Sequence, residues 1–186
     1  DVYKRQKIDN ISVYEARIRG GATLAKTYPV DADLVCGVPD SGLASAKGYS
    51  EESGIPFGLA FHKNSYVGRT FIKPTQKERE SSVKIKLSVL ESVVKGKRIV
   101  LVDDSIVRGT TISNLITMLR KAGATEVHVR ISSPPFLYPC YFGTDVPSNK
   151  QLIASSHSTE EIRQQIGADS LGYMPIEELQ NMVGDL

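Results

Sequence analysis

The sequence predicts an α/β fold in which a mainly parallel sheet is flanked by helices. Residues 99–102 read Ile-Val-Leu-Val, and residues 34–38 read Leu-Val-Cys-Gly-Val. Continuous apolar runs of this kind are typical of strands that are buried on both faces, as in a parallel sheet. Each run leads through a turn of small and polar residues into a segment with helical spacing. Repeated strand–turn–helix units are typical of parallel sheets with crossover helices.

Length and composition indicate one ordinary domain over residues 1–186, with residues 1–8 as a tag or truncated edge. Forty per cent of the residues are hydrophobic, which is enough for a core. The net charge of +2 gives no reason to expect a nucleic acid or membrane partner. No apolar run approaches the roughly 18 residues of a membrane-spanning helix. We therefore expect a cytoplasmic protein.

The first part of the chain predicts two helices and two strands. Ser12 and Glu15 match a capping box, so we expect a helix to begin there. Its apolar face is predicted to consist of Ile11, Tyr14, Ile18, Ala22 and Ala25. The patterns that follow predict a strand at 34–38, a helix at 43–52 and a strand at 54–61.

The second part predicts further helices and strands, at 85–94 (helix), 99–102 (strand), 112–119 (helix) and 126–131 (strand). Gly123 is expected to cap the helix at 112–119. His128 lies on the polar side of the last strand's alternation, which predicts a surface position. A second capping box, Ser158 with Glu161, opens a helix through residue 166, and Pro175 opens another at 176–183.

Two carboxylates, Asp103 and Asp104, end the apolar strand at 99–102. Adjacent carboxylates repel, so they favour a cation or hydroxyl donors as partners. A magnesium ion and a sugar diol supply both. The alternative is a strand end at which two aspartates face water and cap the next helix.

The turn at residues 105–111 reads Ser-Ile-Val-Arg-Gly-Thr-Thr and leads into a helix. Its N–H groups and the positive end of the helix dipole form a favourable place for a phosphate. Arg108 adds charge, and Thr110 and Thr111 offer hydroxyls and potential helix caps. The turn does not match G-x-x-x-x-G-K-[ST], so it is not a P-loop. Together with the aspartates, it predicts a sugar phosphate as the ligand.

Residues 39–42 read Pro-Asp-Ser-Gly and join a predicted strand to a predicted helix. In a doubly wound sheet such loops gather at the carboxyl ends of the strands, where ligands bind. The composition also suits an ordinary turn, so the loop alone leaves both interpretations open.

Residues 62–86 contain seven basic residues against two glutamates and show poor periodicity. Such a segment is often a solvated loop, but long loops in compact domains are also often lids. A basic lid would close over a polyanion and neutralise a leaving group such as pyrophosphate. We expect a flexible lid here.

The run V-D-D-S-I-V-R-G-T-T at 102–111 resembles the phosphoribosyl pyrophosphate (PRPP) signature of type I phosphoribosyltransferases. Its form is close to that of the amidophosphoribosyltransferase family. The resemblance implies the type I phosphoribosyltransferase fold. It implies that Asp103 and Asp104 hold the ribose hydroxyls and take part in magnesium binding. The 5′-phosphate then falls to Ser105, Ile106, Val107, Arg108, Gly109, Thr110 and Thr111.

Two other segments carry the resemblance. Residues 39–42 resemble the family's pyrophosphate loop, which would consist of Pro39, Asp40, Ser41 and Gly42. The resemblance implies that Ser41 helps to hold magnesium and that the loop contains a strained or cis peptide. Residues 63–71 resemble the family's flexible catalytic loop, which implies catalytic, phosphate-facing roles for Lys63 and Arg69.

Cys140, in Pro139-Cys140-Tyr141, is either a buried thiol or an iron–sulfur ligand. One branch of the family has a four-iron cluster with a cysteine in this context, and such a cluster needs four ligands. The chain has one other cysteine, Cys36, in a predicted central strand where the family places no ligand. The resemblance therefore implies a cluster that this chain alone cannot complete.

The family resemblance implies transfer of ammonia to C1 of PRPP, with release of pyrophosphate, to give 5-phosphoribosylamine for purine synthesis. In this family a glutaminase domain with an N-terminal cysteine supplies the ammonia, and position 1 here is Asp. We expect the isolated phosphoribosyltransferase half of a protein that is a homo-oligomer when full length, with residues 150–186 as a C-terminal helical extension. The alternatives are a nucleobase phosphoribosyltransferase and a regulator that senses PRPP.

Overall fold

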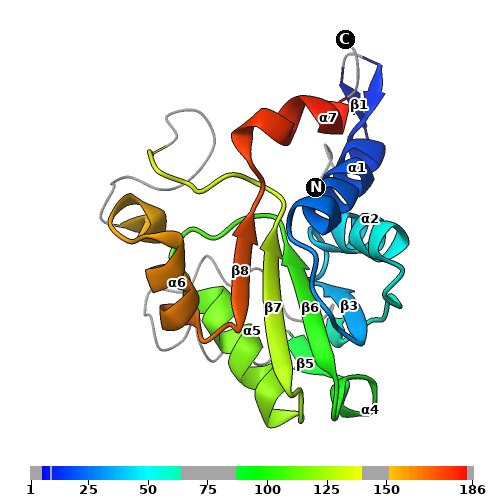
Figure 1. Ribbon diagram of the computed structural model, residues 1–186, viewed down its shortest axis with the longest axis vertical. Helices are drawn as coiled ribbons and strands as arrows, with labels where there is room; N and C mark the ends of the chain where they lie inside the picture. The colour runs from blue at the N-terminus through cyan, green and yellow to red at the C-terminus, as the bar shows by residue number, and fades with distance from the viewer. Residues whose placement is uncertain (1–5, 9, 64–86, 140–150, 184–186) are drawn as a thin grey trace.

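A four-stranded parallel sheet forms the centre of the computed structural model, which describes residues 6–8, 10–63, 87–139 and 151–183 (Figure 1). Neighbouring strands in the order β3-β6-β7-β8 are parallel throughout. Their bounds are Leu34–Gly37 (β3), Arg98–Asp103 (β6), Glu126–Ile131 (β7) and Ser170–Tyr173 (β8). The sheet and its flanking helices confirm the predicted α/β class.

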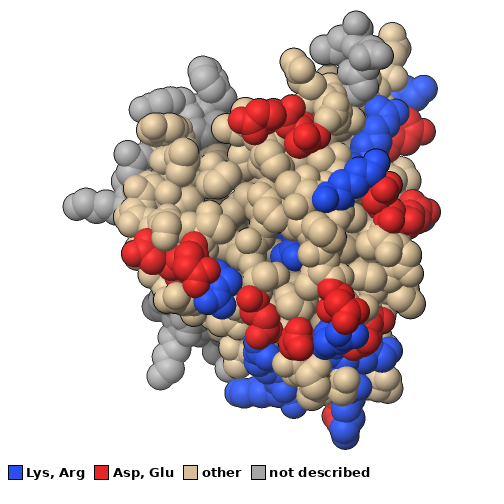
Figure 2. All heavy atoms as spheres, in the orientation of Figure 1, with Lys and Arg blue, Asp and Glu red and all other residues tan. Residues whose placement is uncertain are grey.

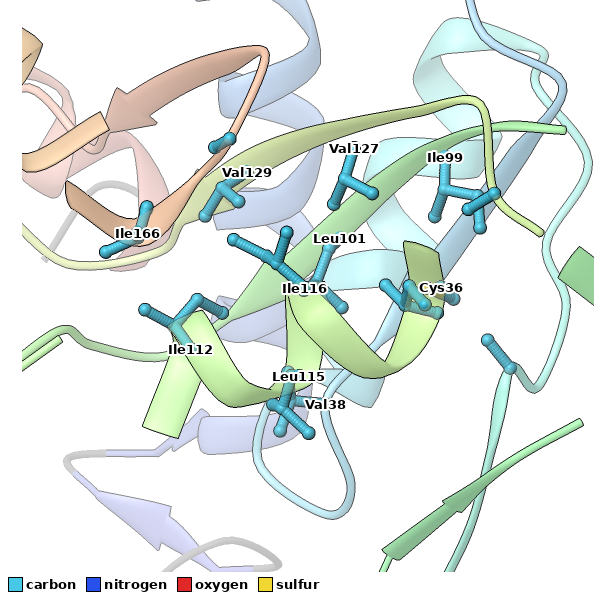
Figure 3. Packing of buried hydrophobic residues seen from close by; sticks show 14 of the residues in the cluster. Cys36, Val38, Ile99, Leu101, Ile112, Leu115, Ile116, Val127, Val129 and Ile166 are labelled. Carbon is cyan, nitrogen blue, oxygen red and sulfur yellow. The ribbon is translucent and has the colours of Figure 1, made fainter. Parts of the chain in front are cut away.

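Helices cover both faces of this sheet because β6 is apolar at every position between its ends. Ile99 and Leu101 belong to one buried cluster, which includes residues of α5 (Thr110–Lys121) and α6 (Thr159–Ile166). Val100 and Val102 belong to a second cluster, with residues of α1 (Val13–Thr27) and α2 (Leu43–Ser53). Figure 3 shows the first cluster, in which Leu101 lies against the α5 helix.

Helices α1 and α2 pack so closely that glycine is required at their contact. A Cβ on Gly21 would lie 1.8 Å from the main-chain oxygen of Ser45, and one on Gly48 would lie 1.9 Å from that of Ile18. The predicted apolar face of α1 is therefore wrong in part: Tyr14 is 48% exposed. The buried residues of the helix are Gly20, Gly21, Leu24 and Ala25, of which the prediction included only Ala25. One half of the predicted capping box is confirmed, since Ser12 Oγ accepts a hydrogen bond from the N–H of Glu15 at 3.3 Å.

Two predictions around the lid are wrong. In the segment 54–61, Phe57 makes an isolated bridge to Val35 and only Phe61 belongs to a strand, because Gly54, Pro56 and Gly58 interrupt the rest. The predicted helix at 85–94 is, within its described part, a strand and a single helical turn: β5 (Leu87–Val89) and α4 (Glu91–Val94). β5 pairs antiparallel with β4 (Phe61–Lys63), and this long-range pairing overrides the local helical pattern.

The other predicted elements are present. Besides α5, β7 and α6, the C-terminal part contains η5 (Ile176–Glu178) and α7 (Leu179–Val183). Gly123 follows the cap residue Ala122 with a φ of 94°. Four short elements were not predicted: β1 (Lys7–Ile8), β2 (Ile11–Ser12), η4 (Ile153–Ser155) and β8. Thus the C-terminal region at 150–186 also supplies a strand of the main sheet. No helix among the described residues is long and apolar enough to span a membrane.

His128 is buried rather than on the surface, because β8 pairs beside it. Only 7% of the residue is exposed, with Nδ1 3.0 Å from Ser170 Oγ and Nε2 3.0 Å from Glu126 Oε2. Arg130, next on the same face, is 3% exposed and donates to the main-chain oxygen of Tyr28 at 3.2 Å. Burial lowers the pKa of Arg130. The alternation of polar and apolar residues correctly placed His128 and Arg130 on one face of β7. It could not show that Tyr28 and Ser170 cover this face.

The amino ends of β3 and β6 are fastened by Arg98. Its guanidinium donates to Asp33 at 2.8 Å and 3.1 Å, and its main-chain N–H donates to the same carboxylate at 2.9 Å. These hydrogen bonds hold the pKa of Asp33 at about 2. The two strands are therefore held in register at the end opposite the loops described next.

We predict that Gly21→Ala destabilises the protein by about 1–3 kcal/mol, because the new methyl group meets a backbone oxygen that cannot move away. Gly20→Ala is the matched control, since its Cβ would meet only the flexible end of Met182. Alanine also favours the helix at both positions. Chemical denaturation measures the difference, and equal stability of the two variants would contradict the close packing.

Candidate functional site

The loops that follow β3 and β6 lie side by side at the carboxyl end of the sheet. The N–H of Val38 donates to the main-chain oxygen of Val102 at 2.9 Å. A Cβ on Gly42 would lie 2.3 Å from that oxygen, so only glycine fits there. The β3 loop (residues 38–42) therefore rests directly on the strand end that leads into the β6 loop (residues 104–109).

The β3 loop is a tight turn that leads directly into α2. The N–H of Gly42 donates to the main-chain oxygen of Val38 at 2.9 Å and closes the turn, and Gly42 then serves as the N-cap of α2. The peptide between Pro39 and Asp40 is cis, as the family resemblance implied. Asp40 is exposed, and Ser41 is half-buried beside it. The predicted pyrophosphate residues thus lie together at the sheet's edge.

Asp103 and Asp104 stand at the end of β6, as predicted. Asp103 is 8% exposed, and its Oδ1 accepts the N–H of Asp104 at 2.8 Å. Its main-chain oxygen accepts the N–H of Ser132 at 2.9 Å, which fixes the strand end from the β7 side. Asp104 is half-buried, with Ser105 Oγ 3.4 Å from its Oδ1. The pair therefore presents one buried and one more accessible carboxylate.

The β6 loop leads into α5 without a side-chain cap. Gly109 is the N-cap, with a φ of 77°, and no side chain caps the helix there. Thr110 and Thr111 are the first residues of the helix rather than its cap, and both are exposed. The first N–H groups of α5 and the positive end of its dipole consequently face the loop, which favours an anion at that place.

Other parts of the chain hold the β6 loop from behind. Ile106 is 3% exposed and belongs to the cluster that contains α5 residues. Val107 accepts the N–H of Ile153 at 2.9 Å, and Ile153 Cδ1 would lie 2.9 Å from a Cβ on Gly109. Arg108 is exposed and donates to the Gln151 side chain. Sequence reasoning missed the support from Gln151 and Ile153, because these contacts span more than forty residues.

Lys63 is the described residue that links the predicted lid to the site. It ends β4, and its Nζ forms an ion pair with the carboxylate of Asp40 in the β3 loop. The structure thus brings the predicted lid lysine to the predicted pyrophosphate loop. Arg69, the rest of the lid at 64–86 and Cys140 lie outside the described residues.

Arg17 is a residue of the site that sequence reasoning missed. It lies half-buried on α1, and its Nη1 donates to the main-chain oxygen of Ser41 at 3.0 Å. No local motif marks it, because the contact forms only when α1 packs against α2. It adds a second cationic side chain that contacts the β3 loop.

The oxygen donors of the site suit magnesium. Asp103, Asp104 and Ser41 offer carboxylate and hydroxyl oxygens, which are hard ligands. Among the described residues there is no group of three His, Cys, Asp or Glu that would form a complete protein cage for a metal. The usual magnesium site does not need such a cage, because one or two carboxylates act together with water and substrate phosphates.

Two buried groups near the sheet are unsuited to nucleophilic or acid–base catalysis. Burial raises the pKa of the Cys36 thiol to about 12, and Cys36 is fully buried in β3. Burial also raises the pKa of Tyr173, at the end of β8, to about 12. Both stay protonated at neutral pH.

The chain belongs to the phosphoribosyl transferase domain family, whose sequence pattern matches residues 9–132. The matched range includes β3, β6 and both loops. The match confirms the type I phosphoribosyltransferase resemblance of residues 102–111.

More specifically, the chain is similar to amidophosphoribosyltransferases. It is 56% identical to that of Bacillus subtilis over 95% of this chain and 37% of the relative, and 56% identical to that of Methanocaldococcus jannaschii over 95% and 38%. A solved structure of glutamine PRPP amidotransferase from B. subtilis, complexed with ADP and GMP, matches with a TM-score of 0.87 and 55% identity. That match covers 97% of this chain and 40% of the solved one. The chain thus spans well under half the length of these relatives.

We predict that Gly42→Ala lowers stability by about 1–3 kcal/mol and also separates the two loops, because its Cβ would collide with backbone. Gly54→Ala is the matched control. It places alanine at a φ of 73° but in open space at the far end of α2. Both variants should lose stability in denaturation, and only Gly42→Ala should weaken binding of a phosphorylated sugar such as PRPP. Equal PRPP affinity of the two variants would show that the loop contact does not shape the site.

Proposed function

We propose that this chain is the PRPP-using part of an amidophosphoribosyltransferase. It transfers ammonia to C1 of PRPP and releases pyrophosphate, giving 5-phosphoribosylamine for purine synthesis. The observation that carries the proposal is the direct contact between the β3 loop and the end of β6. It brings an anion-binding helix start, a carboxylate pair and a second small-residue loop to one edge of the sheet. The similarity to amidophosphoribosyltransferases supports it.

In the proposed complex, each part of PRPP meets groups of matching chemistry. The ribose diol binds the carboxylates of Asp103 and Asp104. The 5′-phosphate lies against Ser105–Thr111, where the N-terminus of α5 offers N–H groups and positive dipole. The pyrophosphate lies at Pro39–Gly42. The ligand would therefore span both loops, with C1 between them.

Magnesium would be held by Asp103, Asp104 and the Ser41 hydroxyl together with oxygens of the substrate. When bound, the ion supplies positive charge that stabilises the pyrophosphate as it leaves. The aspartates would otherwise repel both each other and the phosphates of the ligand.

The proposed reaction needs positioning and charge stabilisation rather than a protein nucleophile. The nitrogen of ammonia forms a bond to C1 while the bond from C1 to the pyrophosphate oxygen breaks, and the new ammonium group then loses one proton to water. Negative charge grows on the pyrophosphate, and Lys63 lies at the loop where this charge would develop. Closure of the lid would add Arg69 and exclude water. In the ion pair that the structure shows, Lys63 neutralises Asp40 and so lowers repulsion near the pyrophosphate.

We further propose that a glutaminase domain supplies the ammonia in the complete protein, that the complete protein is a cytoplasmic homo-oligomer, and that neither nucleic acid nor membrane is a partner. Cys36 is buried among apolar side chains of the sheet, which makes it unsuitable as an iron–sulfur ligand. Of the two cysteines, only Cys140 is proposed as a ligand of an iron–sulfur cluster. The other ligands would come from parts of the full-length protein outside this chain.

The two alternatives have less support. Eight relatives of 51–57% identity are named amidophosphoribosyltransferase, which favours ammonia over a nucleobase as the acceptor. On the face shown in Figure 2, acidic and basic side chains are intermixed. This one face therefore gives no support to the continuous basic surface that a nucleic-acid-binding regulator usually presents.

We predict that Asp104→Ala weakens PRPP binding by about 10- to 100-fold and abolishes pyrophosphate release, because the ribose diol loses a charged acceptor. Release from PRPP with magnesium is measured with ammonium chloride and, separately, with glutamine. The unmodified chain should use ammonium and should not use glutamine.

Glu91→Gln is the matched control, since this exposed carboxylate lies in α4, before β6 begins. It should leave turnover unchanged. Normal turnover by Asp104→Ala would refute the assignment of the carboxylate pair. Product formation from glutamine by the purified chain would refute the proposal that the ammonia comes from a separate domain.

A further inference from the structure

Arg17 contacts the β3 loop from a different element of the fold. Its Nη1 donates to the main-chain oxygen of Ser41 at 3.0 Å, across 24 residues of sequence. A hydrogen bond that carries a charge is roughly twice as strong as a neutral one, so it fixes the carbonyl's direction more firmly. The half-burial of Arg17 shields the bond from bulk water.

The same peptide unit is held on its opposite side. A trans peptide is planar, and its carbonyl and N–H point in opposite directions. In the peptide between Ser41 and Gly42, the carbonyl accepts from Arg17 and the N–H donates to Val38 at 2.9 Å. Because both ends are bonded, the plane has little freedom to rotate. The direction of the Ser41 side chain, which leaves the chain at this peptide, is limited with it.

Helix α1, which carries Arg17, is held in a fixed position against α2. Helix α1 approaches α2 so closely that Gly21 and Gly48 leave no room for a Cβ. Since α2 begins directly after the β3 loop, the distance from α1 to this loop is set by backbone contacts. The guanidinium therefore meets a loop in a fixed place rather than following a mobile one.

Arg17 also brings charge to this position. Within the described part of the chain, none of the ion pairs includes Arg17, whereas the neighbouring Asp40 is paired with Lys63. A half-buried cation that lacks a carboxylate partner favours an anion nearby, because its field is only partly screened.

We propose that Arg17 is a positioning residue for the pyrophosphate of PRPP. It holds the Ser41–Gly42 peptide in its binding orientation and supplies positive charge behind the β3 loop. This inference rests on the proposed function, because it assumes that the β3 loop receives the pyrophosphate. It predicts a selective effect: loss of Arg17 harms binding of the pyrophosphate and leaves the diol and 5′-phosphate parts of the site intact.

The test compares two ligands. PRPP with magnesium occupies the whole site. Ribose 5-phosphate lacks the pyrophosphate, so its affinity measures binding to the carboxylate pair and the β6 loop alone. Isothermal titration gives both affinities for the unmodified chain and for Arg17→Met, Arg17→Lys and Arg19→Met. Arg19 is the matched control, because it is an exposed arginine two residues along α1 that lines the groove beside α7.

We expect Arg17→Met to weaken PRPP binding by about tenfold or more, as for loss of a charged hydrogen bond. Its affinity for ribose 5-phosphate should stay within about twofold of the unmodified chain, a difference too small to reflect a lost hydrogen bond. Arg17→Lys keeps the charge and one donor, so it should recover part of the PRPP affinity. Arg19→Met should behave as the unmodified chain with both ligands.

The possible failures are distinct. If Arg17→Met binds PRPP as well as the unmodified chain does, the inference is overturned and the proposed function stands. Equal weakening of both ligands would mean that Arg17 only stabilises the fold, which also overturns the inference. If the unmodified chain binds ribose 5-phosphate but gains nothing from the pyrophosphate, the proposed role of the β3 loop fails, and the inference fails with it.

Discussion

Val102 is the point at which two distant segments of the chain meet. Its main-chain oxygen accepts the N–H of Val38, and Gly42 packs against it at a distance that excludes any side chain. Because β3 and β6 are parallel neighbours, both loops emerge from the same edge of the sheet. Without this contact there would be a carboxylate pair and a small-residue loop, but no shared site.

The charges of the site suit a polyanion that carries a sugar, which is the ligand that we propose. The carboxylates of Asp103 and Asp104 suit hydroxyl groups and a divalent cation, whereas the start of α5 suits a phosphate. Two cationic side chains contact the neighbouring β3 loop: Lys63 pairs with Asp40, and Arg17 donates to the main-chain oxygen of Ser41. Close backbone contacts at Gly21, Gly48 and Gly42 fix the helices and the loop that carry part of these groups.

The sequence was most informative where local residues determine the structure. One short stretch of sequence contains the whole motif, because the β6 strand, its aspartates and the turn into α5 follow one another directly. The pairing of β4 with β5, the strand β8 and the burial of His128 depend on partners far along the chain. Arg17 was missed for the same reason. Arg17 reaches the β3 loop because α1 packs closely on α2, and the two buried glycines Gly21 and Gly48 permit this packing. No sequence motif indicates such a contact.

A crystal structure of the chain with PRPP and magnesium tests the central claim most directly, since it shows whether one ligand bridges both loops. The account predicts the 5′-phosphate at Ser105–Thr111, the diol at Asp103 and Asp104, and the pyrophosphate at Pro39–Gly42. A complex in which the pyrophosphate lies away from the β3 loop, or in which PRPP binds elsewhere, would contradict it.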